Sequence, residues 1–243
     1  MSAPTLSGDA AITACACGEA AWHRLALAAL ELPSFEDDGM WWRRDATSPV
    51  HHAGVTVAPA ARLPEGIAPG TVRDSFGDLE LSGWTPAPAD PWMVREPAAI
   101  PTAAVDGLVL DTAVNPDEVW VFERTAVRGA VGEEAATRYP PFSIHGRESG
   151  QVPGLRLLLG RLDGIPVATA IAARWKDGVC ISGVTVIESA RRRGVGTAMT
   201  CAALRAAPDV PASLCASALG YGVYERLGFR EVGRGLDWTP PAT

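Results

Sequence analysis

Lysine is almost absent from this chain of 243 residues. Lys176 is its single lysine, and the other basic side chains are arginines. Together with the abundant alanine, this usage indicates a bacterial source with a GC-rich genome. The formal net charge is −7, whereas a general nucleic-acid binder carries a basic surface. We therefore expect no nucleic-acid partner.

Long hydrophobic runs are missing as well. No apolar run approaches the roughly 20 residues that a membrane helix needs. Met1–Ala10 contain no basic residue ahead of an apolar stretch, as a secretory signal would. We therefore expect a cytoplasmic protein with no membrane partner. Hydrophobic residues make up 47% and charged residues 20% of the chain, which is typical of a globular protein with a real core.

Cysteine is sparse, and its pattern fits neither a disulfide scaffold nor a zinc knuckle. The chain has five cysteines, an odd number at scattered positions. Cys15 and Cys17 are separated by one residue, fewer than zinc knuckles use. His51 and His52 also suggest a metal, but adjacent residues on a strand point to opposite faces. We expect reduced cysteines and no bound metal.

The acidic residues are concentrated in the first half. Residues 1–115 hold six arginines and fifteen carboxylates, whereas residues 116–243 hold fifteen basic and thirteen acidic side chains. The second half is therefore better suited to an anionic ligand. The first half is either a solvated acidic surface or a site for a cationic ligand.

The first hundred residues give weak structural signals. Apolar spacing predicts a helix over 18–32. Residues 51–59 read as a short strand. Residues 86–101 contain five prolines and read as a connector around one short edge strand at Trp92–Val94.

The second half is clearer. Residues 107–114 are predicted to form a strand. Asn115 then fits a helix N-cap, with Pro116 at the first helical position and Glu118 able to reach back to the cap. The elements predicted after it are strands over 155–162, 167–175 and 179–186 in an antiparallel meander, a helix over 194–206, a strand over 213–218, a short helix over 222–227 and a final strand over 230–238.

The most informative segment joins the third strand of the meander to the next helix. It contains Arg191, Gly194 and Gly196 in the pattern Arg-x-x-Gly-x-Gly. Glycines let the backbone approach a phosphate, and the free N–H groups of a first helical turn bind anions. The segment lacks the Lys-Ser/Thr of a Walker loop and the spacing of a dinucleotide fold. By itself it fits a phosphate cradle, a basic surface turn or a nucleic-acid patch on Arg191–Arg193.

This segment resembles the acyl-CoA-binding motif of the GNAT superfamily of N-acyltransferases, in which Arg191, Gly194 and Gly196 match the consensus. A second family signature ends in Tyr-x-x-Leu-Gly-Phe, and residues 224–229 match it. The two motifs occur in the family's order, about thirty residues apart. The resemblance covers roughly residues 107–243, and its motifs are dense from residue 150 onward.

The resemblance implies an α/β (α+β) GNAT fold, with a mixed, mostly antiparallel sheet flanked by helices. Residues 107–243 would be the GNAT acetyltransferase domain. Residues 79–84 faintly echo residues 224–229, since each segment would form a short helix ended by glycine. Residues 1–106 are therefore interpreted as a degenerate GNAT-like copy, or else as an unrelated cap domain.

The resemblance also implies acetyl-CoA as co-substrate and assigns site residues. Tyr224 would be the catalytic acid that protonates the leaving thiolate; a phenol has an ordinary pKa near 10. The residues expected to bind the co-substrate, through the backbone of the fourth strand and the phosphate loop, are Val184, Thr185, Val186, Arg191, Arg192, Arg193, Gly194, Val195, Gly196 and Thr197. No metal is implied.

Some roles stay open at the level of sequence. Ser217 stands where many family members have Asn, and either bonds the pantetheine arm or caps a strand end. No base for the acceptor amine is marked. The candidate bases are Glu188, His145 and Glu148, or else a carboxylate reached through a chain of water molecules.

The function expected from the resemblance is N-acetyltransfer from acetyl-CoA to a primary amine, by direct attack in a ternary complex. The acceptor would be a small molecule or a peptide N-terminus, as in natural-product tailoring or self-resistance. A monomer or homodimer is expected. The alternative is a non-catalytic acyl-CoA-binding regulatory or interaction module.

Overall fold

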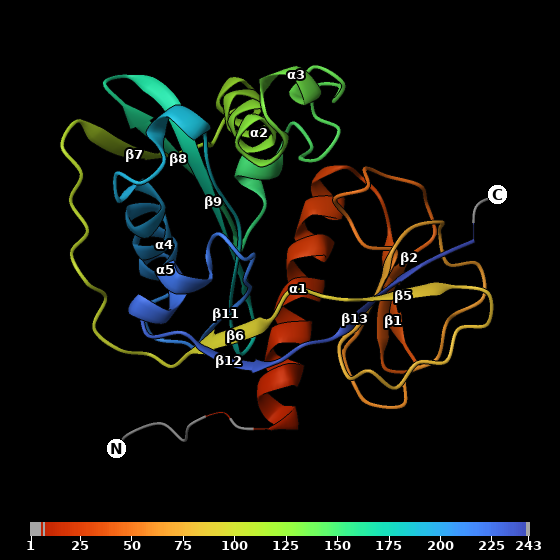
Figure 1. The fold of residues 1–243 in the computed structure, drawn as a ribbon. Coiled ribbons are helices and arrows are strands. Elements are labelled where there is room, and N and C mark those ends of the chain that lie inside the picture. Colours follow the sequence, from red (N-terminus) through yellow and green to blue (C-terminus); the bar gives the residue numbers. More distant parts are fainter. Residues whose placement is uncertain (1–5, 7, 242–243) are drawn as a thin grey trace.

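The computed structural model describes residue 6 and residues 8–241. Residues 1–10, in which we expect no secretory signal, lie partly outside this described part. The structure contains two sheets and the helices packed on them (Figure 1). Among the helices of the described residues, none is both long and apolar enough to cross a membrane.

The larger sheet has seven strands in the order β12-β6-β11-β10-β9-β8-β7. Its strands are β6 (Trp92–Arg95), β7 (Leu108–Thr112), β8 (Leu155–Leu162), β9 (Ile165–Trp175), β10 (Gly178–Val186), β11 (Ala212–Cys215) and β12 (Arg230–Gly233). All neighbours are antiparallel except β10 and β11, which are parallel. The predicted mixed, mostly antiparallel sheet with its meander is confirmed.

The smaller sheet has six strands in the order β1-β2-β3-β4-β13-β5. Its strands are β1 (Ser34–Asp37), β2 (Met40–Arg43), β3 (Gly54–Thr56), β4 (Val72–Asp74), β5 (Thr85–Pro88) and β13 (Leu236–Thr239). Only β3 and β4 pair in parallel. The first half of the chain thus builds most of a second mixed sheet.

Helix α1 (Asp9–Ala29) lies between the two sheets (Figure 1). It packs on β9, β10 and β11 of the larger sheet and on β3 of the smaller one. The helix begins nine residues before the predicted start at residue 18, because the alanine-rich stretch from residue 10 onward contains no helix breaker.

The larger sheet carries helices on both faces. Helix α2 (Pro116–Val131) shares one face with α1, whereas α4 (Val195–Arg205) and α5 (Tyr221–Arg226) cover the other. Strand β9 shows the alternation that this arrangement requires. Its Ala170 packs with the α4 and α5 residues, and its Ile171 packs with Trp22 of α1 and Phe122 of α2. The short helices are α3 (Glu133–Ala136), η1 (Ser149–Gln151) and η2 (Glu188–Ala190).

Strand β6 is interior, which corrects the expected edge strand at Trp92–Val94. It lies between β11 and β12 and pairs with both. Proline is confined to edges because it removes a ladder donor, but the prolines of this segment flank β6 and none lies within it.

The single strand predicted over 230–238 is wrong, because the structure divides it into two strands. Strand β12 belongs to the larger sheet, and β13 crosses to the smaller one. Gly235 lies between them and packs so closely on β4 that a Cβ there would meet the Asp74 carbonyl oxygen. With β6 in the larger sheet, each sheet thus takes a strand from across the boundary at residues 106 and 107. The two predicted domains, 1–106 and 107–243, stay a prediction.

No helix forms over residues 79–84, although the echo of residues 224–229 predicts one. The Asp74 side chain accepts hydrogen bonds from the backbone N–H groups of Gly77 and Leu79, at 2.9 and 3.0 Å. These bonds hold the segment as a turn, since an Asp side chain competes with helical bonding. The interpretation of residues 1–106 as a degenerate copy stays a prediction.

The start of α2 is the one predicted from sequence. Asn115 Oδ1 accepts a hydrogen bond from the Glu118 N–H at 3.0 Å, and Glu118 Oε2 accepts one from the Asn115 N–H at 3.3 Å. Pro116 occupies the first helical position, where its missing N–H leaves no bond unmade. The capping box therefore fixes where the chain turns from β7 into the helix that borders the site.

Replacing Asn115 by Ala removes the cap acceptor. We expect the free energy of unfolding to fall by about 1 kcal/mol, measured by urea denaturation. Asn115→Asp keeps an acceptor oxygen and serves as the control, with a change of a few tenths at most. An equal loss of unfolding free energy in both variants would show that the amide group of Asn115, rather than its acceptor oxygen, stabilises the helix.

Candidate functional site

Strands β10 and β11 part within the sheet. They pair only at Val179 with Ala212 and at Cys180 with Ser213. Beyond this point β10 continues to Val186 without β11 and is paired with β9 alone. The pairing of β10 with β9 also shifts after Ser182, next to Gly183, whose φ is +55°. The second half of β10 thus has one edge without a strand partner, and backbone groups on such an edge are free to bind a ligand.

A cavity of about 1110 Å³ opens at this divergence. Most of the residues predicted to bind the co-substrate line it. They are Val184, Thr185, Val186, Arg191, Arg192, Gly194, Val195, Gly196 and Thr197. Tyr224, Ser217 and His145 line it too, whereas Arg193, Glu148 and Glu188 do not. The structure therefore brings together the two segments that the sequence motifs single out, the turn before α4 and the helix α5.

The phosphate loop ends where α4 begins. Gly194 is the N-cap and has a φ of +81°, a left-handed conformation that favours glycine. The first helical N–H groups have no intrahelical partner, and none of the hydrogen bonds of the described residues uses those of Val195, Gly196 or Thr197. A Cβ on Gly196 would meet nothing closer than Val186 Cγ2 at 3.7 Å. The loop therefore presents free donors and open space to an anion.

The Arg191 side chain holds the loop in place. Its Nε donates to the Val186 carbonyl at 3.0 Å, and its Nη2 donates to the Gly129 carbonyl of α2 at 3.0 Å. These donors are thus engaged by the protein itself. Arg192 is exposed at the cavity in a left-handed conformation, with φ of +60°. Of the predicted arginines, Arg192 has the guanidinium placed to meet a ligand, and Arg191 shapes the loop.

Tyr224 lies on α5, with its ring against Gly220. A Cβ on Gly220 would come within 2.7 Å of the Tyr224 ring, so the ring position requires a glycine there. Burial, with a smaller effect from Cys215, raises the pKa of Tyr224 to about 12. The phenol thus stays protonated throughout the neutral range. Ser217 accepts a hydrogen bond from the Gly220 N–H at 3.3 Å, which places its hydroxyl at the turn before α5.

The opposite wall of the cavity is a buried charged cluster that no sequence motif marks. Its cavity-lining members are Glu19 and His23 on α1, Arg73 on β4, and His52 in the loop before β3. Arg73 Nη1 lies 3.4 Å from Glu19 Oε2, and Arg73 Nε lies 2.6 Å from Oδ1 of Asp237 on β13. The acidic excess of the first half is the one available signal, and it does not say which carboxylates meet.

His51 and His52 both belong to this cluster, although their adjacency predicts side chains on opposite faces of a strand. They lie in the loop before β3, where that alternation does not apply. His52 Nδ1 is 2.9 Å from Glu19 Oε1, and His51 Nδ1 is 3.2 Å from His23 Nδ1. One ligand atom from each of Glu19, His23 and His52 lies within 4.8 Å of the others. Among the described residues, Glu19, His23 and His52 are therefore a group whose donor atoms lie close enough together to hold a metal ion.

Burial sets the protonation of the cluster. It lowers the pKa of His23 to about 4 and that of His51 to about 3, so both imidazoles are neutral at pH 7. Burial alone would raise the pKa of the Glu19 carboxyl, but the neighbouring Arg73 guanidinium holds it well below its usual range. The cluster therefore presents a carboxylate and the neutral imidazole of His23 to the cavity.

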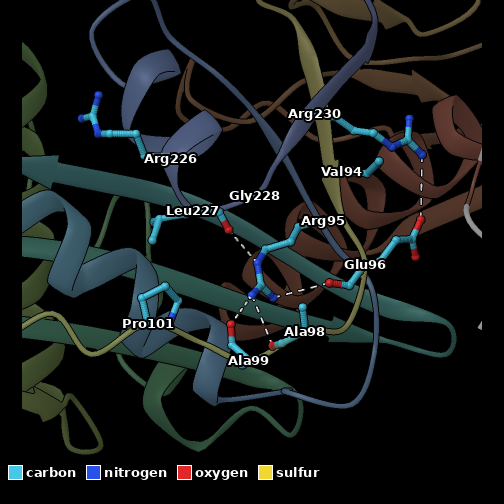
Figure 2. Close-up of a pocket in the computed structure, with 10 residues that line it drawn as sticks. All are labelled: Val94, Arg95, Glu96, Ala98, Ala99, Pro101, Arg226, Leu227, Gly228 and Arg230. Carbon is cyan, nitrogen blue, oxygen red and sulfur yellow. Dashed lines mark hydrogen bonds and ion pairs between the residues drawn. The ribbon is translucent and has the colours of Figure 1, made fainter. Parts of the chain in front are cut away.

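A second, smaller pocket of about 510 Å³ lies beside β6 and is lined by none of the predicted site residues. Figure 2 shows the Arg95 guanidinium pointing at surrounding backbone carbonyls. It donates to Leu227 at 2.8 Å and to Ala99 at 2.8 Å. Arg95 therefore fastens the segment after β6 to the end of α5, a structural role.

The comparisons with known proteins find similarity in structure only. No protein-family model matches the chain, and no curated protein does. A GCN5-related N-acetyltransferase from Kribbella flavida is 18% identical, with a TM-score of 0.56 over 93% of this chain and 96% of that one. A putative acetyltransferase of the GNAT family from Novosphingobium aromaticivorans is 21% identical, with a TM-score of 0.53 over 94% and 99%.

A functionally unknown conserved protein from Staphylococcus epidermidis is 12% identical, with a TM-score of 0.57 over 86% of this chain and 93% of that one. These structures match 86–94% of the chain, and therefore most of its first hundred residues, at identities that establish the fold alone. The chain therefore has the fold of the GCN5-related N-acetyltransferases.

Proposed function

We propose that the chain is an N-acetyltransferase that transfers an acetyl group from acetyl-CoA to a primary amine. The observation that carries this proposal is that free backbone donors and a protonated phenol line one cavity. The donors are those of the β10 edge and of the α4 N-terminus, and the phenol is Tyr224. The fold supports the same chemistry.

The α4 N-terminus is suited to the pyrophosphate of the co-substrate. The free N–H groups of Val195–Thr197 and the helix dipole attract anionic oxygens, and Arg192 adds a positive charge beside them. The N–H groups along the open edge of β10 would bond the pantetheine arm and polarise the thioester carbonyl. The missing Cβ at Gly196 leaves room for a phosphate to approach.

The amine nitrogen then attacks the thioester carbonyl carbon, and the carbon–sulfur bond breaks. Tyr224 is protonated at neutral pH, with a pKa of about 12, and gives its hydroxyl proton to the leaving thiolate. The surplus proton on the acylated nitrogen is then lost to water, which returns a proton to the Tyr224 phenolate. The acceptor enters from the opposite wall, where the carboxylates of Glu19 and Asp90 outnumber the Arg73 guanidinium. This negative balance favours a cationic acceptor, such as a small amine or a peptide N-terminus. Every group named here belongs to one chain, so a monomer or a homodimer is sufficient.

Calorimetric titration of the chain with acetyl-CoA, beside CoA, tests the proposal directly. We expect one site per chain with a micromolar dissociation constant, about −8 kcal/mol, followed by thiol release when primary amines and peptides are added. Failure to bind acetyl-CoA would overturn the proposal. Binding without thiol release in any amine screen would favour the non-catalytic module.

Gly196→Ala separates the cradle from the fold. The new methyl meets no close atom of the protein, and Ala is favoured over Gly in a helix by about 0.5–1 kcal/mol. We expect an unchanged or higher melting temperature with acetyl-CoA affinity reduced at least about tenfold. Gly222→Ala on α5 is the matched control, since Gly222 lies in a helix but does not line the cavity. Unchanged affinity in Gly196→Ala would contradict the phosphate cradle.

Tyr224→Phe removes the proton donor and keeps the ring. We expect turnover to fall by about 10²–10⁴-fold with the dissociation constant of acetyl-CoA retained. Because the phenol titrates at about pH 12, the wild-type rate should not decline between pH 8 and pH 10 through loss of this proton. Unchanged turnover in the variant would remove Tyr224 from the mechanism.

A further inference from the structure

All four histidines of the chain lie in one region, beside the cavity. His23, His51 and His145 pack around the Trp22 ring, with ring centroids 5.3–5.7 Å from it. His52 lies 5.0 Å from His23, centroid to centroid. Three of the four are joined to one another or to Glu19 by polar contacts. The contacts of His51 and His23 determine which ring nitrogen carries the proton in these two residues.

The hydrogen bonds determine the tautomers of two imidazoles. His51 Nε2 lies 2.9 Å from the Ile144 carbonyl oxygen, which can only accept, so this nitrogen carries the proton. In a neutral imidazole the other nitrogen, Nδ1, then holds a lone pair. His23 Nδ1 lies 3.2 Å from that lone pair and therefore donates to it. His23 Nε2 is left with a lone pair of its own.

This lone pair faces other electron-rich atoms. His23 is 2% exposed, and its Nε2 makes no hydrogen bond to the described residues. Glu19 Oε1 lies 3.7 Å from it. His52 Nδ1 lies 2.9 Å from the same oxygen but is misaligned for a hydrogen bond, so it too is unpartnered. Buried imidazole nitrogens that converge on one carboxylate oxygen without a hydrogen bond are costly unless a cation lies between them.

The charges of the cluster also call for a cation. The Arg73 guanidinium is shared between two carboxylates, those of Glu19 and Asp237. At their formal charges, the two carboxylates and the guanidinium together carry one uncompensated negative charge. A metal bound through Glu19 Oε1 would leave the contact of Arg73 with Oε2 in place.

We propose that Glu19, His23 and His52 form a binding site for one Zn²⁺ ion. Two imidazole nitrogens and one carboxylate oxygen are a ligand set that Zn²⁺ prefers. Bonds of about 2.0–2.1 Å in a tetrahedron place the ligand atoms about 3.3–3.4 Å apart. The separations of 2.9 and 3.7 Å from Glu19 Oε1 bracket this value.

The surroundings match a built site. Glu19 and His23 stand one turn apart on α1, so the helix presents both to the same point. His51 accepts the other N–H of His23 and fixes the ring, as outer partners of metal-bound histidines do. All three ligand residues line the cavity, so the remaining coordination position faces it and would take a water or a ligand oxygen. The site does not depend on the proposed acyl transfer.

The test is calorimetric titration of ZnCl₂ into the untagged full chain after treatment with EDTA and dialysis. We expect one Zn²⁺ per chain with a micromolar or tighter dissociation constant, and a rise in melting temperature on loading. His23→Gln and His52→Gln each remove a ligand and should weaken binding about 100-fold or more. His145→Gln is the matched control, because His145 is equally buried in the same region but is outside the ligand set.

Thermal unfolding of each variant without metal shows whether it folds. His52 is the less buried ligand, with a side chain 15% exposed, so His52→Gln keeps the test valid if His23→Gln does not fold. No binding by the wild-type chain at millimolar Zn²⁺ would overturn the proposal, and the cluster would then hold another cation, such as an ammonium group. Affinity retained in both ligand variants, or lost equally in His145→Gln, would overturn it as well.

Discussion

The separation of β10 from β11 after Cys180 is the constraint on which the site depends. A paired sheet has no room for a ligand and no free peptide groups, because each N–H and C=O is used by a neighbouring strand. By ending the pairing after two residues, the sheet opens an edge of β10 and a cavity beside it. The α4 N-terminus and the α5 tyrosine both line that cavity.

The cavity has two chemically different walls, and each comes from a different part of the chain. The wall built by residues 182–224 offers free N–H donors, an exposed arginine and a protonated phenol. The other wall is built from α1, the loop before β3, and β4, and it offers the Glu19 carboxylate and the imidazoles of His23 and His52. Arg73 binds both Glu19 and Asp237 and thereby ties α1 to both β4 and the crossing strand β13. The first half of the chain is thus part of the site.

Local sequence patterns predicted the structure correctly where the stabilising contacts are between residues close together in the chain. The capping box at Asn115 and the meander of β8, β9 and β10 depend on neighbours in the chain. They fail where long-range pairing decides. Strand β6 has a proline-rich setting typical of an edge, yet it is enclosed by β11 and β12. The segment over residues 230–238 is predicted as one strand, yet it is divided between two sheets, with Gly235 close to the Asp74 backbone at the crossing.

The sequence by itself determined the glycine turn that opens α4, because glycine spacing and the helix that follows are consecutive features with a direct physical meaning. It also indicated the fold through two motifs in a fixed order. The tertiary structure alone decided that Arg191 binds backbone carbonyls rather than facing the cavity as a free cation. It also decided that the four histidines gather around Trp22 and Glu19. Burial then lowers the pKa of His23 and His51, and burial is a property of packing between segments that no local pattern encodes.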